Sequence, residues 1–207
     1  LLADSFEIKV LAGKLVNSSS RISKLFVSIK YGIFKSFVCK QNSSHFDNSH
    51  SLYGFEYLKG INVLTKMNFN LMIDSYVKFF EDFIINTWNP DIIHAHNSNF
   101  AGIVAFSISK KYSIPYIITE HHHLNSTLPD SVQTMVLKSL ANSNYNCFVS
   151  DWQLRTFLLS DNSIEGRVVG NPIDTNLFKP NSEKSCEFVI SHLSNADVSK
   201  DIQTLFN

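Results

Sequence analysis

The first third of the chain contains both strand-like and helix-like patterns of apolar residues. Residues 6–12 alternate between apolar and polar positions, and this period of two predicts a strand. The apolar residues on one face of that strand are Phe6, Ile8 and Val10. After a polar break at 17–20, apolar residues follow a helical spacing over 21–40. The polar segment 41–51 is predicted to be an exposed loop.

The next segment carries the clearest helical pattern of the chain. A weak strand is predicted at 61–65, and an apolar stripe with helical spacing follows it. The stripe consists of Ile73, Tyr76, Val77, Phe80, Phe83, Ile84 and Trp88. Asn89-Pro90 should end this helix, because proline lacks the backbone N–H that a helix requires.

The centre of the chain repeats a strand followed by a helix. Short apolar runs predict strands, whose ranges are 91–96, 115–119, 146–150 and 168–171. A helix with small residues is predicted at 100–112. Capping boxes at 130–133 and 150–153 predict the starts of two further helices, and the helix that starts at 130 should end at about residue 141. This alternation predicts an α/β fold, a Rossmann-like parallel sheet with helices on both faces.

The carboxyl-terminal part of the chain suggests a boundary between domains. Residues 181–187 are polar and form a predicted linker, and a further strand begins at 188. The chain ends at Asn207 inside what should be a helix. We therefore expect one domain over 1–180 and the first strand of a second, truncated domain over 188–207.

Composition and charge exclude several classes of protein. Because 44% of the residues are hydrophobic, the chain can bury a core, which excludes a wholly disordered protein. The charges of its 18 basic and 18 acidic residues cancel, which argues against a nucleic-acid-binding protein. The scattered Cys39, Cys147 and Cys186 form neither a disulfide framework nor a zinc motif and indicate a reducing compartment. No apolar run reaches membrane-spanning length and no signal peptide is visible. We expect a soluble cytoplasmic protein.

Five histidines fall in two clusters that could carry chemistry. His94 and His96 share one strand face, and His96 lies at the carboxyl end of its strand, where open α/β sheets bind ligands. His121, His122 and His123 follow the next strand. Taken singly, His94 is interpreted as a packed core residue and His122 and His123 as solvated loop residues. For His96 and His121, each at a strand end, we favour a functional role.

The same histidines allow an alternative function. A metal-dependent hydrolase could use His94, His96 and His121, but it would need a carboxylate ligand and a water position. Glu120 is the one acid well placed, because Asp91 begins its strand at the opposite end of the sheet. The sequence contains no G-x-G-x-x-G, Walker loop or G-x-S-x-G, which argues against a dinucleotide, P-loop or serine-hydrolase site.

The predicted helix at 21–40 has two interpretations. Basic residues gather on one side of the helical wheel, at Arg21, Lys24 and Lys35, with apolar residues on another. A basic amphipathic helix can bind an anionic membrane surface, so peripheral membrane contact, at the inner face of the membrane, is one hypothesis. The other is a surface helix of the sheet layer.

Four segments together resemble the retaining, B-type glycosyltransferases of the large group-1 (family 4) class. They span about residues 88–207, and in chain order they are PDIIHAHNSNFAGIVAFSISKKYSIPYIITEH, NCFVSDWQLRTFL, VVGNPIDTNLFKP and FVISHLSNADVSKDIQTLF. Their order and spacing carry the match. The resemblance implies two Rossmann-like domains facing a cleft, with the acceptor on the first and a nucleotide-sugar donor on the second. It implies no cofactor and no metal.

The resemblance also assigns roles to individual residues. His121 matches the histidine that borders the transferred sugar and is the implied catalytic residue, and Lys200 matches the lysine that meets the donor diphosphate. The residues implied on the acceptor side are His96, Asn97, Glu120, Ser150 and Asn171. The full-length protein would transfer sugar to a glycan, a lipid-linked sugar or a small molecule, as in polysaccharide biosynthesis. This chain alone would be inactive, and a non-catalytic sugar-binding module is a third hypothesis.

Overall fold

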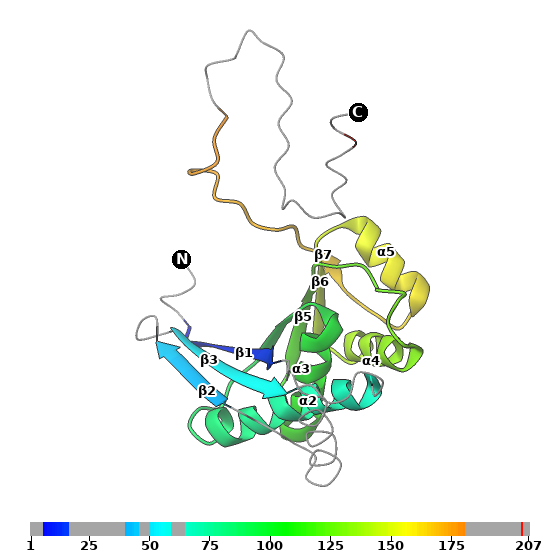
Figure 1. The fold of residues 1–207 in the computed structure, drawn as a ribbon. Helices are drawn as coiled ribbons and strands as arrows, with labels where there is room; N and C mark the ends of the chain where they lie inside the picture. The colour runs from blue at the N-terminus through cyan, green and yellow to red at the C-terminus, as the bar shows by residue number, and fades with distance from the viewer. Residues whose placement is uncertain (1–5, 17–39, 46–49, 59–64, 181–203, 205–207) are drawn as a thin grey trace. The chain divides into compact units, whose positions relative to one another are not determined.

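The computed structural model of the chain describes residues 6–16, 40–45, 50–58, 65–180 and 204 (Figure 1). The chain divides into two units, 1–171 and 172–207, and each is described by itself. In the second unit, the carbonyl oxygen of Asp174 accepts hydrogen bonds from the N–H groups of Leu177 and Phe178, which closes a turn. The predicted linker at 181–187 and the strand that begins at 188 lie outside the described residues, so these domain bounds stay predictions.

The centre of the first unit is a parallel sheet of four strands (Figure 1). Its strands, in spatial order, are β4 (Ile93–His96), β5 (Tyr116–Glu120), β6 (Tyr145–Phe148) and β7 (Arg167–Val168). All three neighbouring pairs are parallel. The predicted strands are confirmed, although β7 is shorter and begins one residue earlier than expected.

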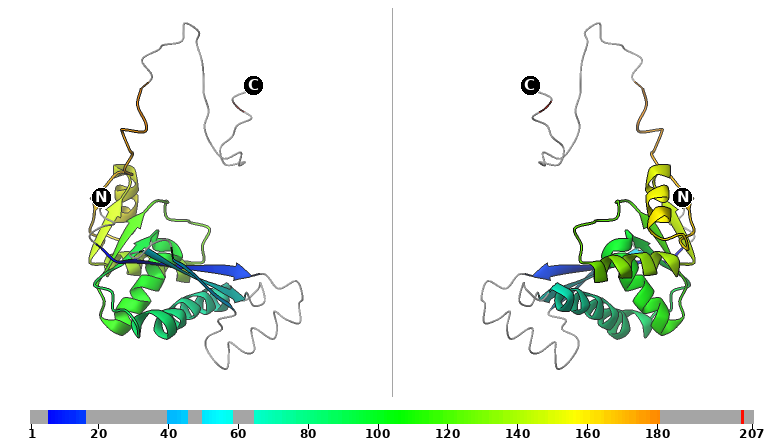
Figure 2. Two further views of the ribbon diagram at one scale, coloured as in Figure 1. Left: turned by 90° about the vertical axis from the view of Figure 1, so that its left-hand side faces the viewer. Right: turned by 90° about the vertical axis from the view of Figure 1, so that its right-hand side faces the viewer.

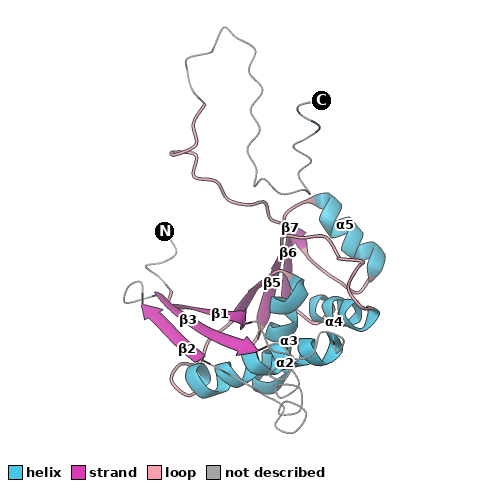
Figure 3. Cartoon of the chain, viewed as in Figure 1, coloured by secondary structure: helices cyan, strands magenta, loops and turns pink. Residues whose placement is uncertain are grey.

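Helices connect the parallel strands and cover one face of their sheet (Figure 3). These helices are α3 (Ile103–Tyr112), α4 (Asp130–Ala141) and α5 (Asp151–Ser160). The buried Tyr116 contacts α3 through Phe106 and donates its hydroxyl hydrogen to the carbonyl of Ser139 in α4 at 2.5 Å. Phe148 packs on Phe157 of α5. The parallel sheet flanked by helices confirms the predicted Rossmann-like α/β class, but among the described residues α3, α4 and α5 all cover one face, whereas helices on both faces were predicted.

Of the two predicted capping boxes, the serine cap at Ser150 is confirmed and the cap at Asp130 is wrong. Ser150 caps α5, because its hydroxyl accepts a hydrogen bond from the N–H of Gln153 at 3.3 Å. Helix α4 instead begins at Asp130, with Pro129 in the cap position and no side-chain cap. The chain enters this helix one residue earlier than the pattern suggested, and Gln133 donates to the carbonyl of Leu128 at 2.7 Å.

A second sheet of three strands precedes the parallel one in the chain. In spatial order its strands are β1 (Ile8–Val16), β3 (His50–Leu58) and β2 (Lys40–His45). Strand β1 pairs with β3 in parallel and confirms the first predicted strand, whereas β2 pairs with β3 antiparallel. The predicted exposed loop at 41–51 is therefore wrong for the described residues 41–45 and 50–51, which form strands. A polar segment can form an edge strand, since pairing depends on backbone hydrogen bonds.

Three other predicted segments lie wholly or mostly outside the described residues. They are the polar break at 17–20, the basic amphipathic helix at 21–40 and the weak strand at 61–65. The last residue of the second and of the third segment is described: Lys40 begins β2, and Thr65 begins a helix. In the described part of the chain no helix is long and apolar enough to span a membrane.

The apolar stripe ending at Trp88 forms helix α2 (Thr65–Phe80), which continues as the π-helical turn η1 (Glu81–Ile85). In both side views of Figure 2 this helix lies below the strands of the three-stranded sheet. Its Phe79 stacks on Phe55 of β3, with ring centroids 4.8 Å apart, and its Phe80 contacts Tyr112 of α3. The helix therefore joins the three-stranded sheet to the helices of the parallel one.

A glycine allows β1 to approach α2 closely. The hydroxyl oxygen of Tyr76 accepts a hydrogen bond from the N–H of Gly13 at 2.7 Å, and a Cβ at this position would lie 2.8 Å from the rings of Phe55 and Tyr76. The face of β1 that carries Gly13 therefore lies against α2. The opposite face, which carries Phe6, Ile8 and Val10, is exposed.

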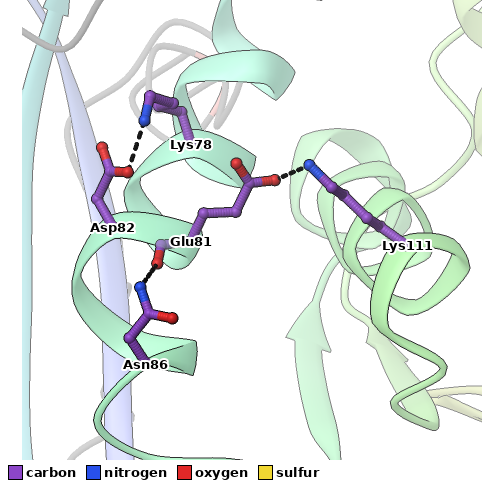
Figure 4. Close-up of polar contacts among 5 residues, drawn as sticks. All are labelled: Lys78, Glu81, Asp82, Asn86 and Lys111. Atoms are coloured by element: carbon purple, nitrogen blue, oxygen red, sulfur yellow. Dashed lines mark hydrogen bonds and ion pairs between the residues drawn. The ribbon is translucent and has the colours of Figure 1, made fainter.

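Exposed polar contacts connect α2, η1 and α3 (Figure 4). Lys78 pairs with Asp82 at 2.5 Å, Asn86 donates to the carbonyl of Glu81 at 2.8 Å, and Lys111 pairs with the Glu81 carboxylate. The hydrogen bond to Glu81 raises the pKa of Lys111. Such surface ion pairs contribute at most about 1 kcal/mol each, so the buried apolar stripe holds this helix in place.

Candidate active site

Two histidines from different strands meet at the carboxyl edge of the parallel sheet. His96 is the last residue of β4, and His121 is the first residue after β5. The Nδ1 atom of His96 and the Nε2 atom of His121 are 3.1 Å apart, a hydrogen-bond distance, and their rings stack with an interplanar angle of 17°. The expectation that both side chains lie at one edge of the sheet is confirmed.

His94 extends this pair along β4. Its ring centroid is 4.4 Å from that of His96, and its Nε2 atom is 2.8 Å from Oγ1 of Thr119. His94 is exposed, because it lies on the sheet face opposite α3 and α4, so its interpretation as a packed core residue is wrong. His122 and His123 are exposed, which agrees with the interpretation of both as loop residues.

The surroundings of His94 and His96 favour their neutral forms. Although both residues are exposed overall, their rings are partly shielded from water by the neighbouring side chains. This desolvation lowers the pKa of His94, and the nearby His96 and His121 lower it further. Desolvation and then His121 lower the pKa of His96. A neutral imidazole has one donor and one acceptor nitrogen, so these rings can bind hydroxyl groups at neutral pH without adding positive charge.

The lowered pKa values predict a pH-dependent loss of stability in acid. The unfolded chain binds protons on these histidines near pH 6.5, whereas the folded chain binds them at lower pH. Their contribution to stability is therefore complete above about pH 6.5 and is lost as the pH falls through the folded pKa values. Urea unfolding between pH 7.5 and pH 5 should show this slope, and His94→Gln should flatten it. An unchanged slope would contradict the assignment.

The backbone after β4 adopts an unusual conformation that supports His121. Asn97 has a positive φ of 73°, and its Oδ1 accepts a hydrogen bond from the N–H of His121 at 3.2 Å. Its own N–H donates to the carbonyl of Thr119 at 2.8 Å. Phe100 also has a positive φ, inside the irregular turn η2 (Ser98–Gly102), so α3 begins later than residue 100. Such backbone strain is typical of functional loops.

Glu120 is buried beneath the same edge and is only 2% exposed. Its Oε2 accepts hydrogen bonds from the N–H of Ser98 at 2.7 Å and from the Ser98 hydroxyl. Its Oε1 accepts a hydrogen bond from the N–H of His122 at 2.8 Å. Both carboxylate oxygens thus accept hydrogen bonds within the protein, and the expected contact of Glu120 with substrate stays a prediction.

A pocket of about 230 Å³ lies beside this edge. Its lining residues are Ser98, Asn99, Glu120, His122, His123, Leu124, Asn125, Leu128 and Val136. The Oδ1 atom of Asn99 is buried and has no hydrogen-bond partner in the described part of the chain. Six of the nine lining residues are polar or charged and three are apolar, so the pocket suits a ligand that forms several hydrogen bonds.

The structure gives less information about the roles of the other predicted site residues. Ser150 follows β6 at the same sheet edge, and its hydroxyl is occupied in capping α5. Asn171 is exposed at the end of the first unit, and Lys200 lies outside the described residues. Sequence reasoning missed Ser98 as the partner of Glu120, and it took Gln153 only for part of a helix cap.

The geometry gives no support to the metal-site hypothesis. Within the described ranges no group of three or more His, Cys, Asp or Glu residues could hold a metal ion. His96 and His121 bond to each other, and the carboxylate of Glu120, next to His121 in the chain, bonds to backbone and hydroxyl donors.

A parallel α/β sheet with polar side chains gathered at its carboxyl edge defines a ligand-binding domain of the Rossmann type. Residues 45–177 match the family model described as Glycosyltransferase Family 4. The match covers more than half of the chain, and the chain belongs to this family of glycosyltransferases. The family inferred from the sequence motifs is confirmed, whereas its retaining, B-type character stays a prediction, and the metal-dependent hydrolase has no support. No curated protein matches the chain.

Proposed function

We propose that this protein transfers a glycosyl unit from a nucleotide-sugar to an acceptor, with retention of the anomeric configuration. Membership of the glycosyltransferase family supports glycosyl transfer. The observation that carries the proposal is the contact between His96 and His121, whose ring nitrogens lie 3.1 Å apart at the sheet edge where α/β domains bind ligands.

In this proposal the described domain binds the acceptor. His121 borders the transferred sugar, and His96 and Asn97 line the acceptor side of the cleft. The adjacent pocket offers the unpaired Asn99 Oδ1 as an acceptor for a hydroxyl hydrogen and offers apolar side chains to the face of a sugar ring. The acceptor is then a glycan, a lipid-linked sugar or a small polar molecule.

The donor side of the reaction depends on a second domain. Lys200 is proposed to contact the donor diphosphate, where a compact positive charge stabilises the leaving group. The reaction needs no cofactor besides the nucleotide-sugar, which is a substrate. A cytoplasmic location, with membrane contact through 21–40, is part of the same proposal.

The experiment is to offer the full-length protein a panel of nucleotide-sugars and candidate acceptors. We expect acceptor-dependent release of nucleotide, and NMR of the product should show the anomeric configuration of the donor, because retention is proposed. The 207-residue chain alone should release none, because the donor is proposed to bind mainly to the second domain. An inverted product would contradict the proposed stereochemistry. Turnover that requires stoichiometric zinc would contradict the proposed reaction.

A further inference from the structure

Two buried side chains hold the loop after β5 from opposite sides. The N–H of His122 donates a hydrogen bond to Oε1 of Glu120 at 2.8 Å, and the carbonyl oxygen of His122 accepts one from Nε2 of Gln153 at 2.7 Å. Glu120 is 2% exposed and Gln153 is 4% exposed. The peptide groups on both sides of this exposed histidine are therefore fixed by side chains that solvent scarcely reaches.

The same two side chains also bind the loops on either side. The other carboxylate oxygen of Glu120 accepts hydrogen bonds from the N–H and the hydroxyl of Ser98, in the loop after β4. The other amide atom of Gln153, Oε1, accepts a hydrogen bond from the N–H of Val149, which follows β6, at 3.0 Å. Three separate loops at the carboxyl edge are thereby connected in series.

We propose that Glu120 and Gln153 are positioning residues that keep His96 and His121 in contact for sugar transfer, an inference that rests on the proposed function. His121 lies between Glu120 and His122, and His96 lies two residues before Ser98. Because side chains alternate across a strand, Glu120 and His121 point to opposite faces of the sheet. Glu120 therefore acts on His121 through the backbone, and Gln153 acts through the carbonyl of His122.

Physical chemistry explains why these two residue types suit the task. An ionised carboxylate has only acceptor sites and can satisfy several converging N–H and O–H groups at once. A buried amide can accept from one loop and donate to another. In a poorly solvated site such bonds are strong, and leaving one unmade is costly, so the loops have few alternative arrangements.

The experiment uses isosteric changes in the full-length protein. Glu120→Gln places an NH₂ group against donors, and Gln153→Glu places a carboxylate oxygen against the carbonyl of His122. We expect kcat to fall about 10²-fold, as a displacement of about 1 Å in the site can cause, while KM for the nucleotide-sugar stays within about twofold. The NMR cross-peak between the ring protons of His96 and His121 should be lost.

A matched control separates positioning from folding. Asn146 is also a buried amide, and it donates to the carbonyl oxygens of Leu140 and Glu165 at the opposite edge of the sheet. Asn146→Asp should lower stability as Gln153→Glu does but should keep kcat and the cross-peak. If Glu120→Gln does not fold, Ser98→Ala removes one bond to the same carboxylate. Its control is Ser139→Ala, whose lost hydroxyl bonds only within α4.

Each possible result of the kinetic and NMR measurements tests one part of the proposal. Retention of the cross-peak and of kcat in both Glu120→Gln and Gln153→Glu would overturn the positioning role. Loss of the cross-peak with kcat unchanged would support the connection between the loops but contradict the role of the histidine pair in catalysis. If the wild-type protein shows no transfer at all, the proposed function fails, and the cross-peak alone decides whether these residues hold the loops together.

Discussion

Replacing His121 with alanine is expected to lower turnover on the order of 10²-fold, the usual cost of removing one group that stabilises a transition state. His121 is half-buried and stacks on His96 at the edge of the sheet, with no place in the buried core. Because such a residue contributes little packing, the free energy of unfolding should change by less than about 1 kcal/mol. Steady-state kinetics and urea unfolding of the same full-length variant measure both quantities.

Two further variants show whether the effect of His121→Ala is specific. His121→Gln can keep a hydrogen bond to Nδ1 of His96 and should therefore lose less activity than the alanine variant. Asn142→Ala removes an exposed side chain that donates to the carbonyl of Lys138 at 2.8 Å, and it should leave kcat unchanged. If His121→Ala instead loses several kcal/mol of stability and keeps its turnover per folded molecule, His121 is a structural residue.

The meeting of His96 and His121 could be predicted from the sequence because it depends on local rules. Apolar runs separated by helical patterns imply parallel strands, and the carboxyl ends of parallel strands meet at one edge of a sheet. The first polar side chains past neighbouring strands must then lie close together. The contact of 3.1 Å follows this rule.

Strand β2 and the start of α4 could not be predicted, because neither depends on its own residues alone. The segment Lys40–His45 has no apolar alternation, and it becomes a strand through backbone pairing with β3, which is not visible in local sequence. At α4, the capping pattern at Asp130 was present in the sequence. However, the loop before the helix places Pro129 in the cap position.

The position of Glu120 shows what side-chain alternation predicts and which contacts it does not reveal. Glu120 follows Tyr116 and Ile118 at a spacing of two, and both of these are buried, so its side chain must point into the same covered face. The resemblance to the family placed Glu120 among the residues on the acceptor side. Its hydrogen bonds to Ser98 and His122 are contacts that no local pattern reveals.

The largest loss of stability is expected for Phe79→Ala in helix α2. Phe79 is fully buried and lies among other aromatic rings: it stacks on Phe55 at 4.8 Å and contacts Tyr53 and Phe83. Removing a buried phenylalanine ring typically costs 3–5 kcal/mol, through lost transfer free energy and the cavity left behind. This is a large share of the roughly 5–15 kcal/mol that stabilises an ordinary domain. Urea unfolding should show the loss directly.

This prediction also tests how the three-stranded sheet is attached to the rest of the unit. Phe55 belongs to β3 and Phe79 to α2, so these stacked rings join the sheet to the helical layer, together with the hydrogen bond between Gly13 and Tyr76. Phe6→Ala is the matched control, because Phe6 is 59% exposed, and it should change the free energy of unfolding by no more than about 0.5 kcal/mol. Equal small losses in both variants would mean that β1, β2 and β3 do not pack on α2. A loss confined to Phe79→Ala would instead identify the aromatic contact as the main stabilising link between them.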